Sequence, residues 1–158
     1  MDDPYPSWYL LTQITQPSVG YLLFNGLLFI LLLLGSALVS GSEVAFFSLS
    51  NEDLESIADE ETKNGKHVAR LLRSPKQLLS TILILNNLIN IAIVTLTTFV
   101  SWSIFGMNAT GIVVIMIQTI GVTFAIVFFG EIVPKVYANK AKIEFSLIMA
   151  PTINFFST

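Results

Sequence analysis

The hydrophobic and polar positions of the chain form two long apolar runs that are separated by a charged stretch. The first run extends from Val19 to Phe47, and the region from Gln77 to Gly130 contains no Asp, Glu, Lys, Arg or His. A helix of about 20 apolar residues is enough to cross a bilayer core of roughly 30 Å. Because the 77–130 region is far longer than one crossing, it predicts a helical hairpin.

A polar, glycine-containing break at 106–111 divides this hairpin, and Trp102 nearby is an aromatic residue typical of a membrane interface. The pattern therefore predicts an all-α membrane protein with three transmembrane helices and short cytoplasmic juxtamembrane amphipathic helices. The expected spans are about 19–48, 76–103 and 111–137, after an N-terminal segment, 1–17, outside the membrane.

The charged stretch at about 51–74 is expected to contain the short amphipathic helices. Ser50 or Asn51 would cap the first of them ahead of an acidic first turn. The residues 63–66 are typical of a turn between two helices. The last segment, about 140–158, is apolar but short and contains proline, so we expect it to lie at the membrane interface.

Every Lys and Arg of the chain lies either between the first two spans or after the third. The positive-inside rule places these regions in the cytoplasm. We therefore expect a multi-pass protein of the inner (plasma) membrane, with its N-terminus and the 104–111 turn outside and its C-terminus in the cytoplasm.

Composition agrees with a membrane protein and excludes several other classes. The chain has 158 residues, of which 53% are hydrophobic and 12% charged, and its mean hydropathy is +0.73. It has no cysteine, which excludes disulfides and thiolate metal sites. A net charge of −3 with localised basic residues does not favour nucleic-acid binding.

Glu131 is the first ionisable residue after the long uncharged region. Pro134 follows it and, in an α-helix, lacks the N–H that would bond the carbonyl of Gly130. An unpaired carbonyl beside a carboxylate is costly in hydrocarbon, so we expect a cation, a water or a hydroxyl there. Alternatively, the motif is only a helix end in which Lys135 pairs with Glu131.

A second group of candidate residues lies on the first span. Ser36, Ser40, Glu43 and Phe47 are spaced by four, three and four residues, which places them on one helical face, whereas Ser42 points elsewhere. The structural alternatives are that the serines bond carbonyls of their own helix and that the glutamate pairs with a cytoplasmic lysine.

Three asparagines, Asn86, Asn87 and Asn90, lie within the otherwise apolar second span. At least two of them can face the interior of the bundle. They either hold helices together through hydrogen bonds or line a site. Hydroxyl, amide, carbonyl and carboxylate oxygens without sulfur or imidazole suit hard cations, namely Mg²⁺, Ca²⁺ or Na⁺.

Three motifs carry a resemblance to a known family: Ser40-Gly41-Ser42-Glu43, the stretch from Leu79 to Asn87, and Gly130-Glu131-Ile132-Val133-Pro134-Lys135. Over roughly 20–158 the chain resembles the transmembrane domain of the CorC/CNNM family of magnesium transporters. The resemblance implies a homodimer formed through the membrane domain, an inward-open acidic cavity, and export of Mg²⁺, with Na⁺ as the coupling ion.

The resemblance also implies roles for individual residues. Family members continue into cytosolic CBS modules, which this sequence does not include, so nucleotide binding is not expected of these residues. The expected Mg²⁺ ligands are Ser36, Ser40, Asn86, Asn87, Asn90, Gly130 and Glu131, with Ser42 and Glu43 lining the cavity and Pro134 breaking the helix.

The alternative function is a membrane scaffold or assembly factor whose polar core only holds the helices together and which moves no ion. An enzyme is not expected, because the membrane residues include no aspartate pair, no histidine and no evident serine–base pair.

Overall fold

The computed structural model describes residues 17–59, 62–106 and 111–157, which form helices and contain no strand. The all-α prediction is therefore confirmed for the described part of the chain. In order, the helices are α2 (Val19–Phe47), α3 (Asn51–Asp59), α4 (Lys63–Leu72), α5 (Pro75–Phe105), α6 (Ile112–Ala125), the π-helical segment η2 (Ile126–Ile132), α7 (Val133–Lys140) and α8 (Lys142–Phe156).

Three helices are long and apolar enough to cross a membrane: α2, α5 and the continuous helix Ile112–Lys140 formed by α6, η2 and α7. This confirms the prediction of three spans. Most of their large apolar side chains are exposed, as expected for surfaces that face lipid. The expectations for residues 1–16 and for most of the break at 106–111 concern positions outside the described residues.

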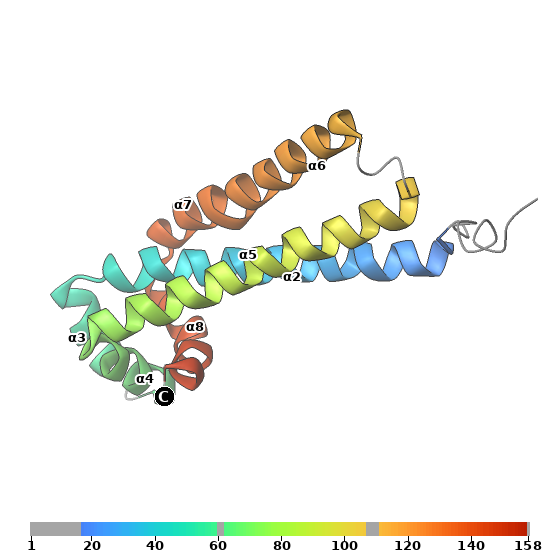
Figure 1. Ribbon diagram of the computed structural model, residues 1–158. Coiled ribbons are helices and arrows are strands. Elements are labelled where there is room, and N and C mark those ends of the chain that lie inside the picture. Colours follow the sequence, from blue (N-terminus) through green and yellow to red (C-terminus); the bar gives the residue numbers. More distant parts are fainter. Residues whose placement is uncertain (1–16, 60–61, 107–110, 158) are drawn as a thin grey trace, which may run out of the picture.

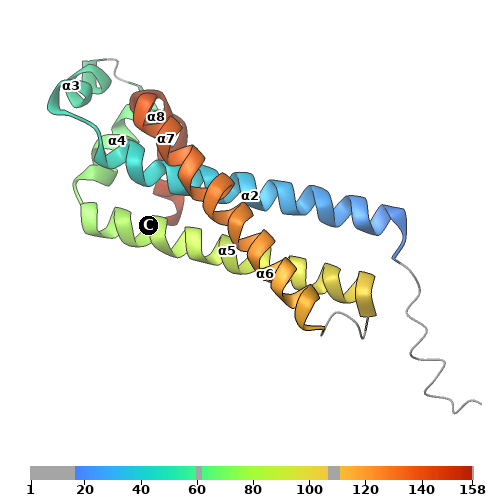
Figure 2. The same cartoon turned by 90° about the horizontal axis from the view of Figure 1, so that it is seen from above.

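The spans are arranged so that the third helix packs on α2 at one end, through η2 and α7, and contacts α5 only slightly, through α6. Helices α2 and α5 lie side by side, while α6 diverges from them and η2 and α7 pack against α2 (Figures 1 and 2). Helix α5 ends at Gly106, whose φ of 55° is in the left-handed region that favours glycine. The polar residues of interest lie at the end where α7 meets α2.

Helices α3, α4 and α8 form the base of the bundle, at the end where α2 and α5 are joined (Figure 1). Helix α8 packs against α4 and α2, and its Pro151 lies inside the helix. The buried core of this end combines residues of five helices. They include Phe46, Ile57, Val68, Leu71, Leu78, Ile82, Met149 and Ile153.

The start of α3 is held by a reciprocal cap. The Ser50 N–H donates to Asp53 Oδ2 at 2.6 Å, and the Asp53 N–H donates to Ser50 Oγ at 3.2 Å. Of the two expected capping residues, Ser50 is therefore the one used. Asp53 also pairs with Lys142 of α8 at 2.5 Å. This ion pair and the two hydrogen bonds from Ser50 lower the pKa of Asp53 to about 2.

The prediction of a turn at 63–66 was wrong, because Lys63 is already the first residue of α4. Thr62 is the N-cap, and its hydroxyl oxygen accepts from the Gly65 N–H at 3.1 Å. Gly65 allows α3 and α4 to approach closely, since a Cβ there would lie 2.9 Å from the Ile57 carbonyl oxygen. The glycine that indicated a turn is thus a packing residue inside a helix.

Candidate metal centre

Polar side chains from two spans meet at Ser36, where η2 crosses α2. The Ser36 hydroxyl is fully buried and lies 2.8 Å from Asn90 Oδ1 and 3.1 Å from Asn86 Oδ1. A hydroxyl has one proton and can donate to one of these oxygens at a time. The serine oxygen and the two amide oxygens therefore share a single proton. Lone pairs of these oxygens remain free to bind a cation.

The spacing of these oxygens is compatible with a small hard cation. Mg²⁺ binds oxygen at about 2.0–2.1 Å in an octahedron, whose neighbouring ligands are consequently about 3 Å apart. The separations of 2.8 and 3.1 Å from Ser36 Oγ lie close to this value. Ordinary hydrogen bonds have the same length, so the spacing suits both an ion site and a hydrogen-bonded core.

The third span adds Gly130 and Glu131 to this cluster. Asn90 Nδ2 donates to Glu131 Oε1 over 3.5 Å, and Glu131 is partly buried. Gly130 is buried against Ser36, because a Cβ at Gly130 would lie 3.0 Å from Ser36 Oγ and 3.5 Å from Ser36 Cβ. The absence of a side chain thus allows the backbone of η2 to reach the hydroxyl of α2.

The backbone of η2 is not α-helical around Gly130. The seven residues Ile126–Ile132 are π-helical, and the Val133 N–H donates to the carbonyl of Phe128, five residues back. From the sequence, an irregular helical turn was predicted at Pro134 on the assumption of α-helical hydrogen bonds. The π-helical segment was not predicted. Such segments are rare and frequently occur at functional sites.

At the end of the π-helical segment, main-chain carbonyl acceptors outnumber the N–H donors. Beyond the carbonyl of Phe128, the next carbonyl with a helical partner is that of Ile132. Ile132 is the N-cap of α7, and its carbonyl accepts the first α-helical hydrogen bond of that helix. Between them lie the three carbonyls of residues 129–131. Pro134 has no N–H, so only the N–H of Lys135 remains for them. Two of these three carbonyls therefore have no main-chain N–H, next to the carboxylate of Glu131.

Ser40 lies one turn below Ser36 on the same face of α2, as the spacing predicted. Its side chain is 1% exposed, and Oγ has no hydrogen-bond partner among the described residues. It borders a hollow of about 30 Å³, which is lined also by Glu43, Asn86 and three apolar side chains of α5. This space is large enough for a water or a small cation, which would satisfy the hydroxyl.

Glu43 pairs with Lys135 of α7 at 2.9 Å. The suggestion that Lys135 pairs with Glu131 was therefore wrong, whereas pairing of Glu43 with a lysine is confirmed. No pattern in the sequence connects residues 43 and 135, although Lys135 lies one turn after Glu131 and thus on the same side of its helix. A second hollow, of about 410 Å³, is lined by both members of this ion pair and by Leu79.

Glu43 and Leu79 border both hollows. The outer hollow, the Glu43 carboxylate, the inner hollow and the oxygens at Ser40 and Ser36 thus follow one another from the base of the bundle inward. We call this row of polar groups along α2 the polar route; the two hollows border its outer part, and Ser36 at its inner end lies against Gly130.

Two of the predicted residues are not brought to this cluster. Asn87 is exposed on the surface of α5. The hydroxyl of Ser42 is buried and donates to the Leu38 carbonyl of its own helix at 2.7 Å, which is the structural alternative for a transmembrane serine.

Within 17–59, 62–106 and 111–157 there is no group of three His, Asp or Glu residues that could hold a metal ion, so most of the oxygens at the candidate site are uncharged.

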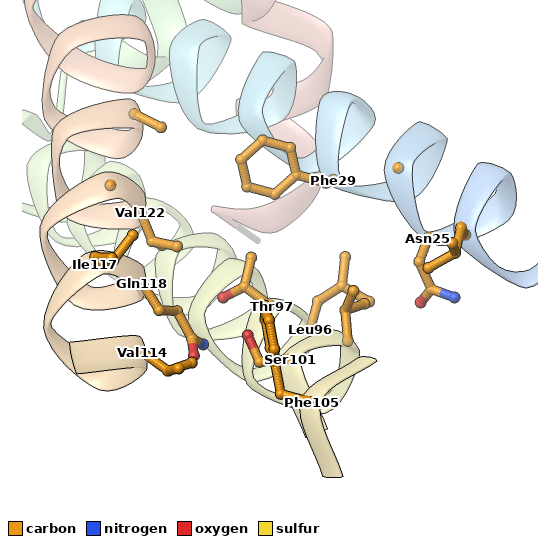
Figure 3. A pocket seen from close by; sticks show the side chains of 15 residues that line it. Asn25, Phe29, Leu96, Thr97, Ser101, Phe105, Val114, Ile117, Gln118 and Val122 are labelled. Carbon is orange, nitrogen blue, oxygen red and sulfur yellow. The ribbon is translucent and has the colours of Figure 1, made fainter. Parts of the chain in front are cut away.

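A cavity of about 580 Å³ lies elsewhere, between α2, α5 and α6 in the half of the bundle away from the base (Figure 3). It contains Asn25, Thr97, Ser101 and Gln118, but its other lining residues are apolar or glycine. No carboxylate lines it, and its nearest residue on α2, Phe29, is seven residues from Ser36, or roughly 10 Å along the helix. It does not form part of the candidate metal centre.

Comparison with known proteins relates the chain to a family of membrane proteins. The UPF0053 inner membrane protein YfjD of Escherichia coli is 36% identical over 120 residues, which cover 73% of this chain and 27% of that protein. A UPF0053 protein of Haemophilus influenzae is 34% identical over 134 residues, which cover 82% of this chain and 31% of that protein. The chain thus spans less than a third of the length of these relatives.

The family model of the cyclin M transmembrane N-terminal domain matches residues 27–158. The match includes the two spans that provide asparagine and glutamate, and the second half of α2 with Ser36 and Ser40. Together with three apolar spans, it shows that the chain belongs to the CNNM transmembrane domain family.

Proposed function

We propose that this chain is the membrane domain of a cation transporter that binds Mg²⁺ and exports it. The ligands come from Ser36, Ser40, Asn86 and Asn90, together with a carbonyl of the Gly130 region and the Glu131 carboxylate. The observation that carries the proposal is the convergence of amide and hydroxyl oxygens on Ser36, beside main-chain carbonyls that have no N–H partner.

The chemistry of this donor set favours a hard divalent cation. All candidate ligands are oxygens, and Mg²⁺ and Ca²⁺ prefer oxygen ligands. One carboxylate supplies charge, and the uncharged oxygens can replace water around the ion. Mg²⁺ rather than Ca²⁺ is favoured by the family resemblance.

The direction and coupling of transport are part of the same proposal. By the positive-inside rule, the positive charges at the base favour a cytoplasmic location for it. In that orientation the hollows beside Glu43 would open toward the cytoplasmic side and would admit the ion from there. Release then occurs at the opposite face. Sodium entry is proposed to drive export, as the resemblance implies.

A homodimer is proposed because of the position of Asn87. This side chain is exposed about 18 Å into α5 along the helix axis, near the middle of the span, where hydrocarbon cannot satisfy an amide. A second copy packed there would supply a partner. Light scattering in detergent should give the mass of a dimer, and Asn87→Leu should weaken it; a monomeric wild-type protein would contradict the dimer.

Isothermal titration of the purified protein with Mg²⁺ tests the site. Glu131→Ala and Asn90→Ala should each weaken binding about tenfold or more, equivalent to about 1.4 kcal/mol. Asn25→Ala is a matched control, since Asn25 lies on α2 far from the cluster and donates to Tyr21 O. Unchanged Mg²⁺ affinity in both site variants would overturn the assignment.

The scaffold is the second candidate, and one observation favours it. Ser36 is hydrogen-bonded to the asparagines and Glu43 is paired with Lys135, so these two side chains already have protein partners. Mg²⁺ flux in proteoliposomes separates the two functions. A transporter should move Mg²⁺ and lose flux with Glu131→Ala, whereas a scaffold should show no flux and keep its fold with either variant.

A further inference from the structure

The outer surface of α4 carries a row of basic side chains that no part of the proposed transport site uses. With 3.6 residues per turn, the four residues concerned lie within an arc of about 80°. All four are exposed. We call this row the basic face; it consists of Lys63, Lys66, Arg70 and Arg73.

The basic face is directly opposite the packed side of α4. The buried residues Gly65, Val68 and Leu71 are centred about 180° from it around the helix, and they contact α3, α5 and α8. The helix is therefore fixed in rotation by its own core. The basic side chains therefore lie on the exposed side of α4, with Arg73 at its edge, beside the hollow between α3 and α4.

The cations of the basic face have no carboxylate partner among residues 17–59, 62–106 and 111–157. The two ion pairs of this part of the chain use Lys135 and Lys142 instead. The acidic side chains Glu52 and Glu55 of the neighbouring helix α3 are exposed and form no ion pair there either. Among the described residues, the basic face thus carries positive charge that no ion pair neutralises.

The position of α4 along the chain fixes the depth of this charge relative to the bilayer. Arg73 is separated from the start of α5 by Ser74 alone, and Lys76 lies in the first turn of α5. The uncharged region begins at the next residue and continues to Gly130. Arg73 and Lys76 therefore lie at the boundary between hydrocarbon and water, at the level of lipid headgroups, and the rest of the basic face extends from Arg73 along α4.

We propose that the basic face, with Lys76, binds the phosphate groups of anionic glycerophospholipids in the leaflet next to the base. Clusters of four to eight Lys and Arg beside a transmembrane helix attract anionic lipid at about 1 kcal/mol for each charge. Arginine adds paired hydrogen bonds to phosphate oxygens. The lipid would thereby hold the α3–α4–α8 base against the membrane.

Native mass spectrometry of the full chain in a neutral detergent tests this proposal. Titration with phosphatidylglycerol should give bound lipid at concentrations where phosphatidylcholine does not bind. The variant Lys66→Gln/Arg70→Gln/Arg73→Gln should bind phosphatidylglycerol roughly a hundredfold more weakly, at about fivefold for each charge. The matched control Lys66→Arg/Arg70→Lys/Arg73→Lys, which keeps all charges, should stay within a few-fold of the wild type.

Each alternative source of binding has its own result. Equal binding of the two lipids, or an unchanged phosphatidylglycerol affinity in the glutamine variant, would overturn the proposal. So would displacement of the lipid by millimolar inorganic phosphate, or preferential binding of polyglutamate. If the triple glutamine variant is misfolded by circular dichroism, Arg70→Gln alone should show the fivefold loss, with Lys140→Gln on α7 as its single-charge control.

Discussion

Among single side chains, Ser36 makes the most contacts with other candidate ligands. Its hydroxyl reaches both asparagines of α5, and its Cβ and Oγ lie against Gly130. The sequence predicted this face of α2 from helical spacing alone. Which asparagines face it was not predictable, because three of them within five positions cannot be sorted without knowing the rotation of α5.

Ser36→Ala should weaken Mg²⁺ binding about tenfold, because it removes the oxygen shared by the two amides. Ser42→Ala is the matched control, since Ser42 bonds only the carbonyl of Leu38, and its affinity should be unchanged. Isothermal titration measures both. Equal losses in the two variants would indicate a general packing effect rather than loss of a ligand.

Asp53 provides a prediction about pH. Its pKa in the folded protein is about 2, below its ordinary value of 3.8, mainly because of the hydrogen bond with Lys142. The stabilisation is therefore complete above pH 3.8 and is lost as pH falls toward 2. Thermal unfolding between pH 2 and 5 should show this loss in the wild type.

In Asp53→Asn the part of the pH dependence due to this carboxylate should disappear. Glu52→Gln, one residue earlier and without an ion pair, is the control and should retain it. The pairing of residues 53 and 142 was not predictable, because it depends on α8 folding back beside α3.

At the level of helices, the third span departs most from the expected pattern. Pro134 correctly marked the irregular turn of this helix, and an unpaired carbonyl there stays a prediction based on its missing N–H. The π-helical segment adds a second such carbonyl and could not be predicted from proline alone, because α- and π-helical bonding require the same residue types.

Pro134→Ala tests the donor count in η2. Alanine restores an N–H, so one of the two unpaired carbonyls gains a partner, and helix propensity also improves. We expect equal or higher thermal stability together with weaker Mg²⁺ binding. Circular dichroism and titration measure the two quantities. Unchanged affinity would show that these carbonyls do not bind the ion.

Gly65→Ala should destabilise the base by about 1–3 kcal/mol. A Cβ there would lie 2.9 Å from the backbone carbonyl oxygen of Ile57, which cannot rotate away as a side chain can. Gly26→Ala on α2 is the control, since no atom lies within 4 Å of its added Cβ. Denaturation in detergent should separate the two; equal stability would contradict this account of α3–α4 packing.

For the whole molecule, the number and kind of spans were predictable because hydropathy and length determine them. The way the spans pack was not, because their apolar surfaces are nearly uniform and small residues such as Gly130 decide the contacts. The order of the polar route, from Glu43 to Ser36, follows from that packing.

The proposed orientation can be measured in intact cells because the chain contains no cysteine. A cysteine at Asn64 should react with a membrane-impermeant maleimide only after the cells are opened. One at Gly111 should react without opening, because that turn is expected outside. The reverse pattern would show that the base faces the outside and that the proposed direction of transport is wrong.

The π-helical segment has one more consequence, which concerns helical phase. A π-helical turn accommodates one residue more than an α-helical turn, and each residue turns an α-helix by about 100°. If η2 were α-helical, α7 would be rotated by about that angle relative to α6. If α6 kept its orientation, Lys135 would then point away from Glu43. The extra residue thus sets the angular offset between the two halves of the third span.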